Sequence, residues 1–206
     1  MHIPISRLTT TLLLAAALAA TGCATSKPSR FYVLASLTPP TSALSPDGPS
    51  IGVGPVVIPQ YLDRPEIVTR SSGNRLDLGE FDQWGGRIGD NITRVLADNL
   101  AGLLGTERVS IYPSADGSGV ADQIGVDILQ FERDQSGSVT LTAFWTIRDT
   151  QSGQVLNRRS TIAKAVGATH TSGTATPYDA IVAAMSEALA DLSKEIAAAV
   201  QTLPAG

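Results

Sequence analysis

The sequence has little of what most small exported domains and most hydrolases depend on. It contains one cysteine and two histidines in 206 residues, and aromatic side chains make up 5%. A single thiol forms no internal disulfide, so the fold is not a disulfide-stapled scaffold. Only His170 follows the first 22 residues, in a segment expected to be a loop. Neither HExxH nor CxxC occurs, which argues against a histidine or cysteine metal centre and leaves little for histidine-based catalysis.

Nucleotide-binding and catalytic motifs are also missing. No GxGxxG or P-loop sequence occurs, and the glycine-rich segment 85–89 has neither the required spacing nor a lysine. Asp63 with Glu66, or Asp122 with Asp127, provides carboxylates that an acid–base pair would need, but carboxylates this frequent often fall close together by chance. We therefore expect no enzyme, no cofactor and no metal. A periplasmic hydrolase remains the less favoured alternative.

No apolar run is long enough to span a membrane. The longest, Leu12–Ala20, follows Arg7 and precedes small residues, whereas a transmembrane helix needs about 20 apolar residues. This pattern predicts a secretory signal. The small residues directly before Cys23 resemble the bacterial lipobox, in which the thiol receives a diacylglyceryl group and the chain is cut ahead of it.

The signal divides the chain into three parts. We expect a lipoprotein signal peptide over residues 1–22, a lipidated tether over 23–30 that starts at Cys23, and one domain over 31–206. A secreted protein with a leftover cysteine is the alternative. In the lipoproteins that this pattern resembles, Asp after the cysteine favours the inner membrane. Ala24 therefore indicates the outer membrane, with the protein facing the periplasm.

The mature chain carries no excess of positive charge. It has 14 basic residues, because Arg7 leaves with the signal, against 19 acidic residues. Such a balance does not favour nucleic acid or electrostatic binding to anionic lipid. Membrane association should therefore depend on the lipid anchor.

The periodicity of the remaining chain predicts an α+β fold. Two helices are expected, one over 83–104 with Asp82 as its N-cap and one that opens at Thr176-Pro177, each with one apolar face. Glycine-ending connectors join segments 124–133, 139–149 and 155–164 into an antiparallel meander. The predicted fold is a twisted, mostly antiparallel sheet with two long helices packed on it. The predicted strands are 31–37, 51–58, 66–70, 75–79, 109–112 and the three of the meander.

The predicted core comes from the apolar faces of the two helices and of the central meander strand. From the helices it includes Trp84, Ile88, Ile92, Val95, Leu103, Ile181, Met185, Leu189, Leu192 and Ile196. From the central meander strand it includes Val139, Leu141, Ala143, Trp145 and Ile147.

The stretch from Pro59 to Arg70 is the most individual part of the sequence. Two prolines stiffen a corner between two strands, and a stiff corner loses less entropy on binding. Tyrosine and arginine are also enriched at interface hot spots. We predict that the corner contacts a partner through Tyr61, Leu62, Asp63, Arg64 and Pro65. In the alternative, the first two residues cap the core and Asp63 and Arg64 form a solvated pair.

This stretch, with the aromatic start Phe31–Leu34 and the tract Trp84–Leu104, resembles the ABC-type transport auxiliary lipoprotein family. That family includes the lipoprotein of the paraquat-inducible membrane-integrity system. The resemblance implies an outer-membrane lipoprotein that works with a mammalian-cell-entry (MCE) domain protein and its ABC transporter to move lipids between the two membranes, with a homo-oligomer possible. An assembly or cell-wall-associated lipoprotein is the alternative.

Overall fold

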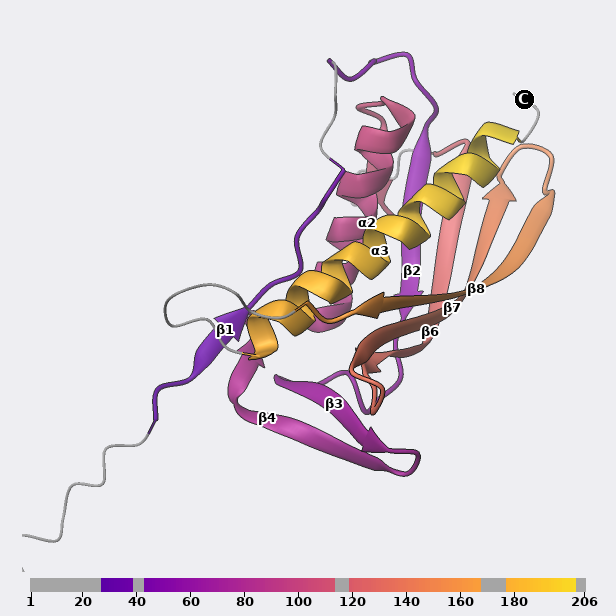
Figure 1. The fold of residues 1–206 in the computed structure, drawn as a ribbon. Coiled ribbons are helices and arrows are strands. Elements are labelled where there is room, and N and C mark those ends of the chain that lie inside the picture. Colours follow the sequence, from indigo (N-terminus) through magenta and orange to yellow (C-terminus); the bar gives the residue numbers. More distant parts are fainter. Residues whose placement is uncertain (1–26, 39–42, 114–118, 168–176, 203–206) are drawn as a thin grey trace, which may run out of the picture.

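The computed structural model (Figure 1) describes residues 27–38, 43–113, 119–167 and 177–202. The expected signal peptide, Cys23, Ala24, His170 and the expected cap Thr176 lie outside these ranges. The elements in chain order are β1 (Arg30–Tyr32), β2 (Ile51–Val57), β3 (Glu66–Ser72), β4 (Arg75–Trp84), α2 (Ile88–Leu104), β5 (Val109–Ile111), β6 (Asp122–Arg133), β7 (Ser138–Asp149), β8 (Val155–Ala165) and α3 (Pro177–Thr202).

One curled, mixed sheet contains all eight described strands. Six follow the order β1-β4-β3-β6-β2-β5, while β7 and β8 extend from β6. Four of the seven pairings, β1–β4, β2–β5, β2–β6 and β3–β6, are parallel. The expectation of a mostly antiparallel sheet is therefore wrong. Turn residues report only pairings between consecutive strands, whereas these parallel pairings join strands that are far apart in sequence.

The predicted meander and its inward-facing set are confirmed. β6–β7 and β7–β8 pair antiparallel over nearly their full lengths. The alternate residues of β7 from Val139 to Ile147 are all buried. The residues between them face the other side of the sheet and include the exposed Phe144. Both helices lie across the same face of this sheet (Figure 1), which leaves the other face open.

The first helix begins later than the sequence suggests. Asp82, expected to be its N-cap, lies in β4, and α2 starts at Ile88 after the Gly85-Gly86 pair. Two successive glycines favour a break between strand and helix, because each costs helix stability relative to alanine. Trp84 therefore enters the core from the end of β4.

One connected apolar core lies between the helices and the sheet. It contains every predicted helix core residue except Leu103, which is only partly buried. In α3 the fully buried set includes Leu189, Leu192 and Ile196. Small buried residues such as Ala188 and Ser193 lie next to them in the helix, so the helix backbone can approach its neighbours closely. No helix in the described ranges has the length and apolar character needed to cross a membrane.

The N-terminal segment 30–38 runs mostly in irregular extended form along α2 and α3. The expected strand 31–37 is reduced to β1, which pairs in parallel with the end of β4. Beyond it, polar groups of α2 and α3 take over the hydrogen bonding. Buried Asn99 accepts bonds from Ser36, Leu37 and Thr38 at 2.7–3.1 Å, and its amide donates to Ser193 Oγ at 3.3 Å. Paired polar groups of this kind make a buried contact specific.

Candidate partner-binding corner

The proline corner is a compact turn between β2 and β3. Its backbone closes on itself, because the amide of Leu62 donates to the carbonyl of Pro59 at 2.9 Å and the amide of Asp63 donates to that of Gln60 at 3.2 Å. On the far side, the amide of Trp84 donates to the carbonyl of Pro65 at 2.7 Å. The corner is therefore tied to the end of β4, next to the start of α2.

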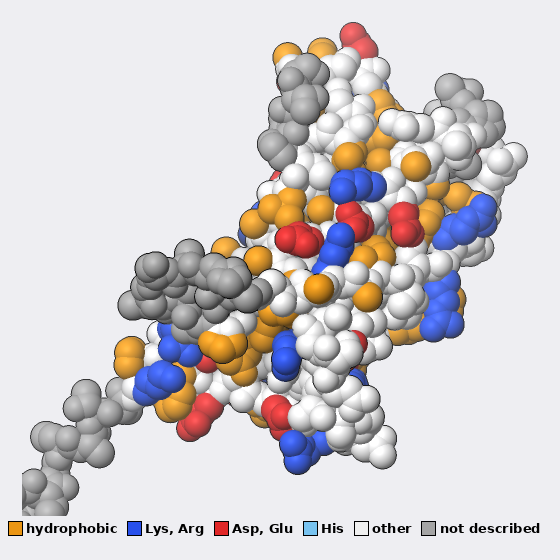
Figure 2. Space-filling view, viewed as in Figure 1, with side chains coloured by type: hydrophobic (Ala, Val, Ile, Leu, Met, Phe, Trp, Pro, Cys, Tyr) orange, Lys and Arg blue, Asp and Glu red, His pale blue; other side chains and the backbone are white. Residues whose placement is uncertain are grey.

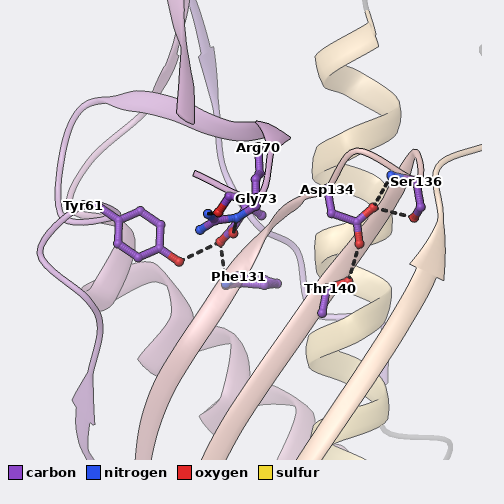
Figure 3. A network of polar contacts seen from close by, with 8 residues as sticks. Tyr61, Arg70, Gly73, Phe131, Asp134, Ser136 and Thr140 are labelled. Carbon is purple, nitrogen blue, oxygen red and sulfur yellow. Dashed lines mark hydrogen bonds and ion pairs between the residues drawn. The ribbon is translucent and has the colours of Figure 1, made fainter. Parts of the chain in front are cut away.

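A buried carboxylate accepts hydrogen bonds from side chains at both ends of the segment from Tyr61 to Arg70 (Figure 3). Glu132 on β6 is fully buried. It accepts hydrogen bonds from the Tyr61 hydroxyl at 2.8 Å, from Arg70 Nε at 2.7 Å and from the amide of Phe131 at 3.1 Å. The guanidinium of Arg70 also lies 5.8 Å from the centre of the Tyr61 ring, within cation–π range.

These contacts shift the pKa values of Tyr61 and Arg70. Burial raises the pKa of the Tyr61 phenol, and its hydrogen bond to the Glu132 carboxylate adds to the effect. The same carboxylate raises the pKa of Arg70 by accepting its hydrogen bond. Both carboxylate oxygens of Glu132 thus have protein donors, and its side chain has no access to solvent. This arrangement supports the fold and offers no acid or base to a substrate.

The five predicted contact residues separate into two groups. Tyr61 is half-buried on Glu132, and Leu62 belongs to the core. Asp63 and Pro65 are exposed, and Arg64 is partly exposed. The corner thus presents three of its five residues to solvent while the other two join it to the fold.

Asp63 and Arg64 do not form the pair considered from the sequence. Arg64 Nε lies 2.9 Å from a carboxylate oxygen of Glu66, which lowers the pKa of that carboxyl. Asp63 instead faces Arg87 at the start of α2, at 4.0 Å. Both are surface contacts of little energetic weight, so these side chains can be recruited by a partner at small cost.

Sequence reasoning missed Glu132. It lies between Phe131 and Arg133 near the end of β6, a strand in which polar residues already alternate with apolar ones, and nothing local shows that its partners come from residues 61 and 70. The one signal in the sequence is that Glu132 directly follows the apolar Phe131. A carboxylate buried beside the core would require a hydrogen-bonding partner. Within the described residues, no group of three or more His, Cys, Asp or Glu side chains is placed to bind a metal.

The architecture is that of an α+β domain with two helices on one face of a curled mixed sheet, and comparison with known proteins assigns it to a class. Residues 32–197 match the ABC-type transport auxiliary lipoprotein component family. The chain belongs to this family, as its sequence motifs indicated. Membership makes the protein a lipoprotein auxiliary component of ABC-type transport systems, anchored to a membrane by lipid, and implies a non-catalytic role.

Solved structures support the fold. A crystal structure of an uncharacterized protein is 19% identical, covers 84% of this chain and 99% of its own, and superposes with a TM-score of 0.68. Protein XCC0632 from Xanthomonas campestris is 17% identical, with 81% and 92% coverage and a TM-score of 0.62. The PelC dodecamer from Paraburkholderia phytofirmans is 13% identical over 72% of this chain and 91% of its own, but its TM-score is only 0.39. No curated protein sequence matches.

Proposed function

We propose that the mature protein is held by lipid on Cys23 at the periplasmic face of the outer membrane and acts as the accessory subunit of an MCE-type lipid transport system. The family match over residues 32–197 is the observation that carries this proposal. The signal-like start and Ala24 in place of Asp support the membrane assignment. The absence of any motif for catalysis in the sequence is consistent with a subunit that binds and positions other proteins.

The exposed part of the corner is the docking surface in this proposal. Asp63, Arg64 and Pro65 form a surface whose backbone is fixed by the buried Glu132 network. A preorganised surface loses little conformational entropy when a partner binds. Its charges are held only by exposed ion pairs, which a partner can replace. The MCE-domain protein is the proposed occupant.

The docking test exchanges charges at the corner. A variant with Asp63→Lys and Arg64→Glu should lose no more than about 1 kcal/mol of stability in thermal unfolding, because the pairs are exposed. It should lose co-purification with the MCE-domain protein and transporter from detergent extract. The matched control exchanges Arg75→Glu and Asp77→Lys, an exposed ion pair of 3.4 Å in the β3–β4 hairpin. Equal co-purification by both variants would return the corner to a purely structural role.

The anchor has a separate test. Mass spectrometry of the mature N-terminus should find Cys23 as its first residue, carrying diacylglyceryl and acyl groups. A Cys23→Ala variant should leave the membrane fraction, because it has no thiol to carry the lipid chains that stable anchoring requires. An unmodified Cys23 in the mature protein would remove the anchor from the proposal and leave the docking test intact.

A further inference from the structure

The N-terminal segment carries the most exposed large hydrophobic side chains of the described residues. Phe31 is 67% exposed and Val33 is 64% exposed. They alternate with Tyr32, which packs against the core, and with the buried Leu34. Extended backbone sends alternate side chains to opposite faces, so Phe31 and Val33 lie on one outward face.

Neighbouring residues of β4 extend this face. Phe31 pairs with Gln83, which places Phe81, two residues earlier on β4, on the same side of the sheet. The ammonium of Lys27 lies 5.8 Å from the centre of the Phe81 ring. Phe31, Val33 and Phe81, with Lys27 at their edge, are called the N-terminal patch below. Figure 2, viewed as in Figure 1, shows orange hydrophobic atoms and blue basic atoms around β1.

The short chain between Cys23 and Lys27 limits how far the N-terminal patch can lie from a lipid on Cys23. Cys23 precedes Lys27 by four residues, and an extended chain advances at most about 3.6 Å per residue, so the two Cα atoms are at most about 14 Å apart. A lipid on Cys23 would therefore hold this end of the domain close to the headgroup layer, whose polar region extends several ångströms above the hydrocarbon.

We propose that the N-terminal patch lies against the membrane and inserts Phe31 and Val33 into the interfacial region of the bilayer. This inference rests on the proposed lipidation of Cys23. Aromatic and aliphatic side chains gain from leaving water at this depth, and an aromatic ring with a basic residue beside it is suited to the interface.

The charges around the patch contribute little net attraction to the membrane, so the contact depends on its apolar side chains. Lys27 lies over Phe81 and Arg87 borders a hollow beside Val33, but the exposed carboxylates of Glu80, next to Phe81 in the chain, and Asp90, at the same hollow, are also close. These opposite charges largely cancel at the membrane surface. The contact should therefore depend little on the fraction of anionic lipid or on salt.

Membrane contact would also orient the corner. The end of β4 is hydrogen-bonded to both the corner and the N-terminal segment, since the amide of Trp84 donates to the carbonyl of Pro65 and the amide of Gly85 donates to that of Tyr32 at 2.8 Å. The patch and the corner thus flank the same few residues. A patch fixed on the bilayer would present Asp63 and Arg64 close to the membrane surface and at a defined height.

The test places a fluorescent reporter in the patch of the full lipidated protein. Phe31→Trp and Val33→Trp variants are reconstituted in phosphatidylethanolamine vesicles that contain brominated phosphatidylcholine, a quencher within the bilayer. Each should be quenched at least about twofold more than the unsubstituted protein, because insertion into the interfacial region brings the indole close to the brominated acyl chains. The native Trp84 and Trp145 are buried and supply the baseline. Added phosphatidylglycerol should leave the quenching unchanged.

The control reporter is Ile111→Trp. Ile111 is 49% exposed on β5, the strand at the other end of the sheet order from β1. Quenching of the patch reporters alone supports the proposal, whereas quenching equal to that of residue 111 overturns it. An emission shift of the patch reporters only when the transporter is added would also overturn it, in favour of a protein-covered patch. A Phe31→Ser, Val33→Ser variant should still co-purify with the transporter, so the docking proposal can fail separately.

Discussion

The β6–β7–β8 meander and the end of the sheet formed by β1, β3 and β4 are held together by different interactions. In the meander, β7 buries a continuous row of alternate apolar residues beneath α3. At the other end, Arg30 donates two hydrogen bonds to Asp82 at 2.7 and 2.8 Å, and Arg70 binds Glu132. The meander thus depends mainly on the hydrophobic effect, with polar contacts in a turn, between β7 and β8, and toward α3. The end formed by β1, β3 and β4 depends in addition on ion pairs to buried carboxylates.

This difference explains where surface residues can be used for binding. A row of apolar side chains tolerates little change, because every member fills volume in a close-packed core. A buried carboxylate that accepts hydrogen bonds from a segment fixes that segment's backbone and leaves the neighbouring side chains free to face solvent. The corner residues Asp63, Arg64 and Pro65 are in this position above Glu132.

The largest loss of stability is expected in the meander. Leu141→Ala on β7 removes a fully buried side chain and should cost about 2–5 kcal/mol, as transfer and cavity terms add. Thermal unfolding measures it. Leu129→Ala on β6 is the control, since Leu129 is exposed, and should melt almost as the unsubstituted protein does. A Leu141→Ala variant with unchanged melting would contradict the core assignment.

A smaller loss is expected at the polar end. Arg70→Met removes the cation beside the buried Glu132 side chain and leaves it only the Tyr61 hydroxyl and a backbone amide as donors. Breaking a buried pair costs several kcal/mol, but Arg70 is 25% exposed and water can partly replace it, so we expect about 1–3 kcal/mol.

A double variant tests whether the pair is the cause. Adding Glu132→Gln removes the unpaired charge while keeping an acceptor for Tyr61. It should recover a substantial part of the loss in thermal unfolding, because neutralising both members of a buried pair is milder than removing one. Additive losses in the two single variants would show that the residues act independently.

Sequence patterns predicted the meander far better than the polar end for a physical reason. Strand alternation from Val139 to Ile147 and the turns ending in Gly137 and Gly153 are local signals, and these two glycines have positive φ at the ends of the expected turns. The parallel pairing of β2 with β6 joins residues some 70 positions apart and leaves no periodic trace. Asp82 was misplaced for the same reason, since it resembles a helix cap until Arg30 is known to lie beside it.

The candidate site was predicted in part. The two prolines and the residues between them located the corner, because proline restricts the backbone wherever it occurs. The division into a supporting half and an exposed half was not visible, since it depends on Glu132, which follows Tyr61 by 71 residues. Burial of individual side chains in a loop follows from tertiary contacts that no local pattern records.

A pH-dependent effect should distinguish the polar end from the meander. Burial opposes ionisation of Asp82, but hydrogen bonds from Arg30 and Tyr32 outweigh it and hold the pKa of its carboxyl below the ordinary value of 3.8. A depressed folded-state pKa stabilises the protein above the unfolded-state value, and this stabilisation is lost as pH falls through the folded-state value.

Asp82→Asn should therefore lower the melting temperature at neutral pH, and the gap to the unsubstituted protein should close as pH falls below about 3.8. Melting curves across this range measure the gap. Leu141→Ala supplies the contrast, because a lost apolar contact should leave a gap that does not close in acid. A gap for Asp82→Asn that stays constant from neutral pH into this acid range would mean that the carboxylate contributes nothing through its charge.

The smallest effect is expected on the open face of the meander. Phe144 is 45% exposed on β7 and contacts Arg159, whose guanidinium carbon lies 5.3 Å from the ring centre. Such exposed cation–π contacts are worth about 0.5–1 kcal/mol, so Phe144→Ser should shift thermal unfolding by no more than that. Trp145, the next residue, points to the other face and donates to Ser160 Oγ at 2.9 Å; Trp145→Ser should destabilise the protein several-fold more. If the two substitutions cost the same, the open face would be as tightly packed as the core, and the sharp contrast between the two sides of the meander would fail.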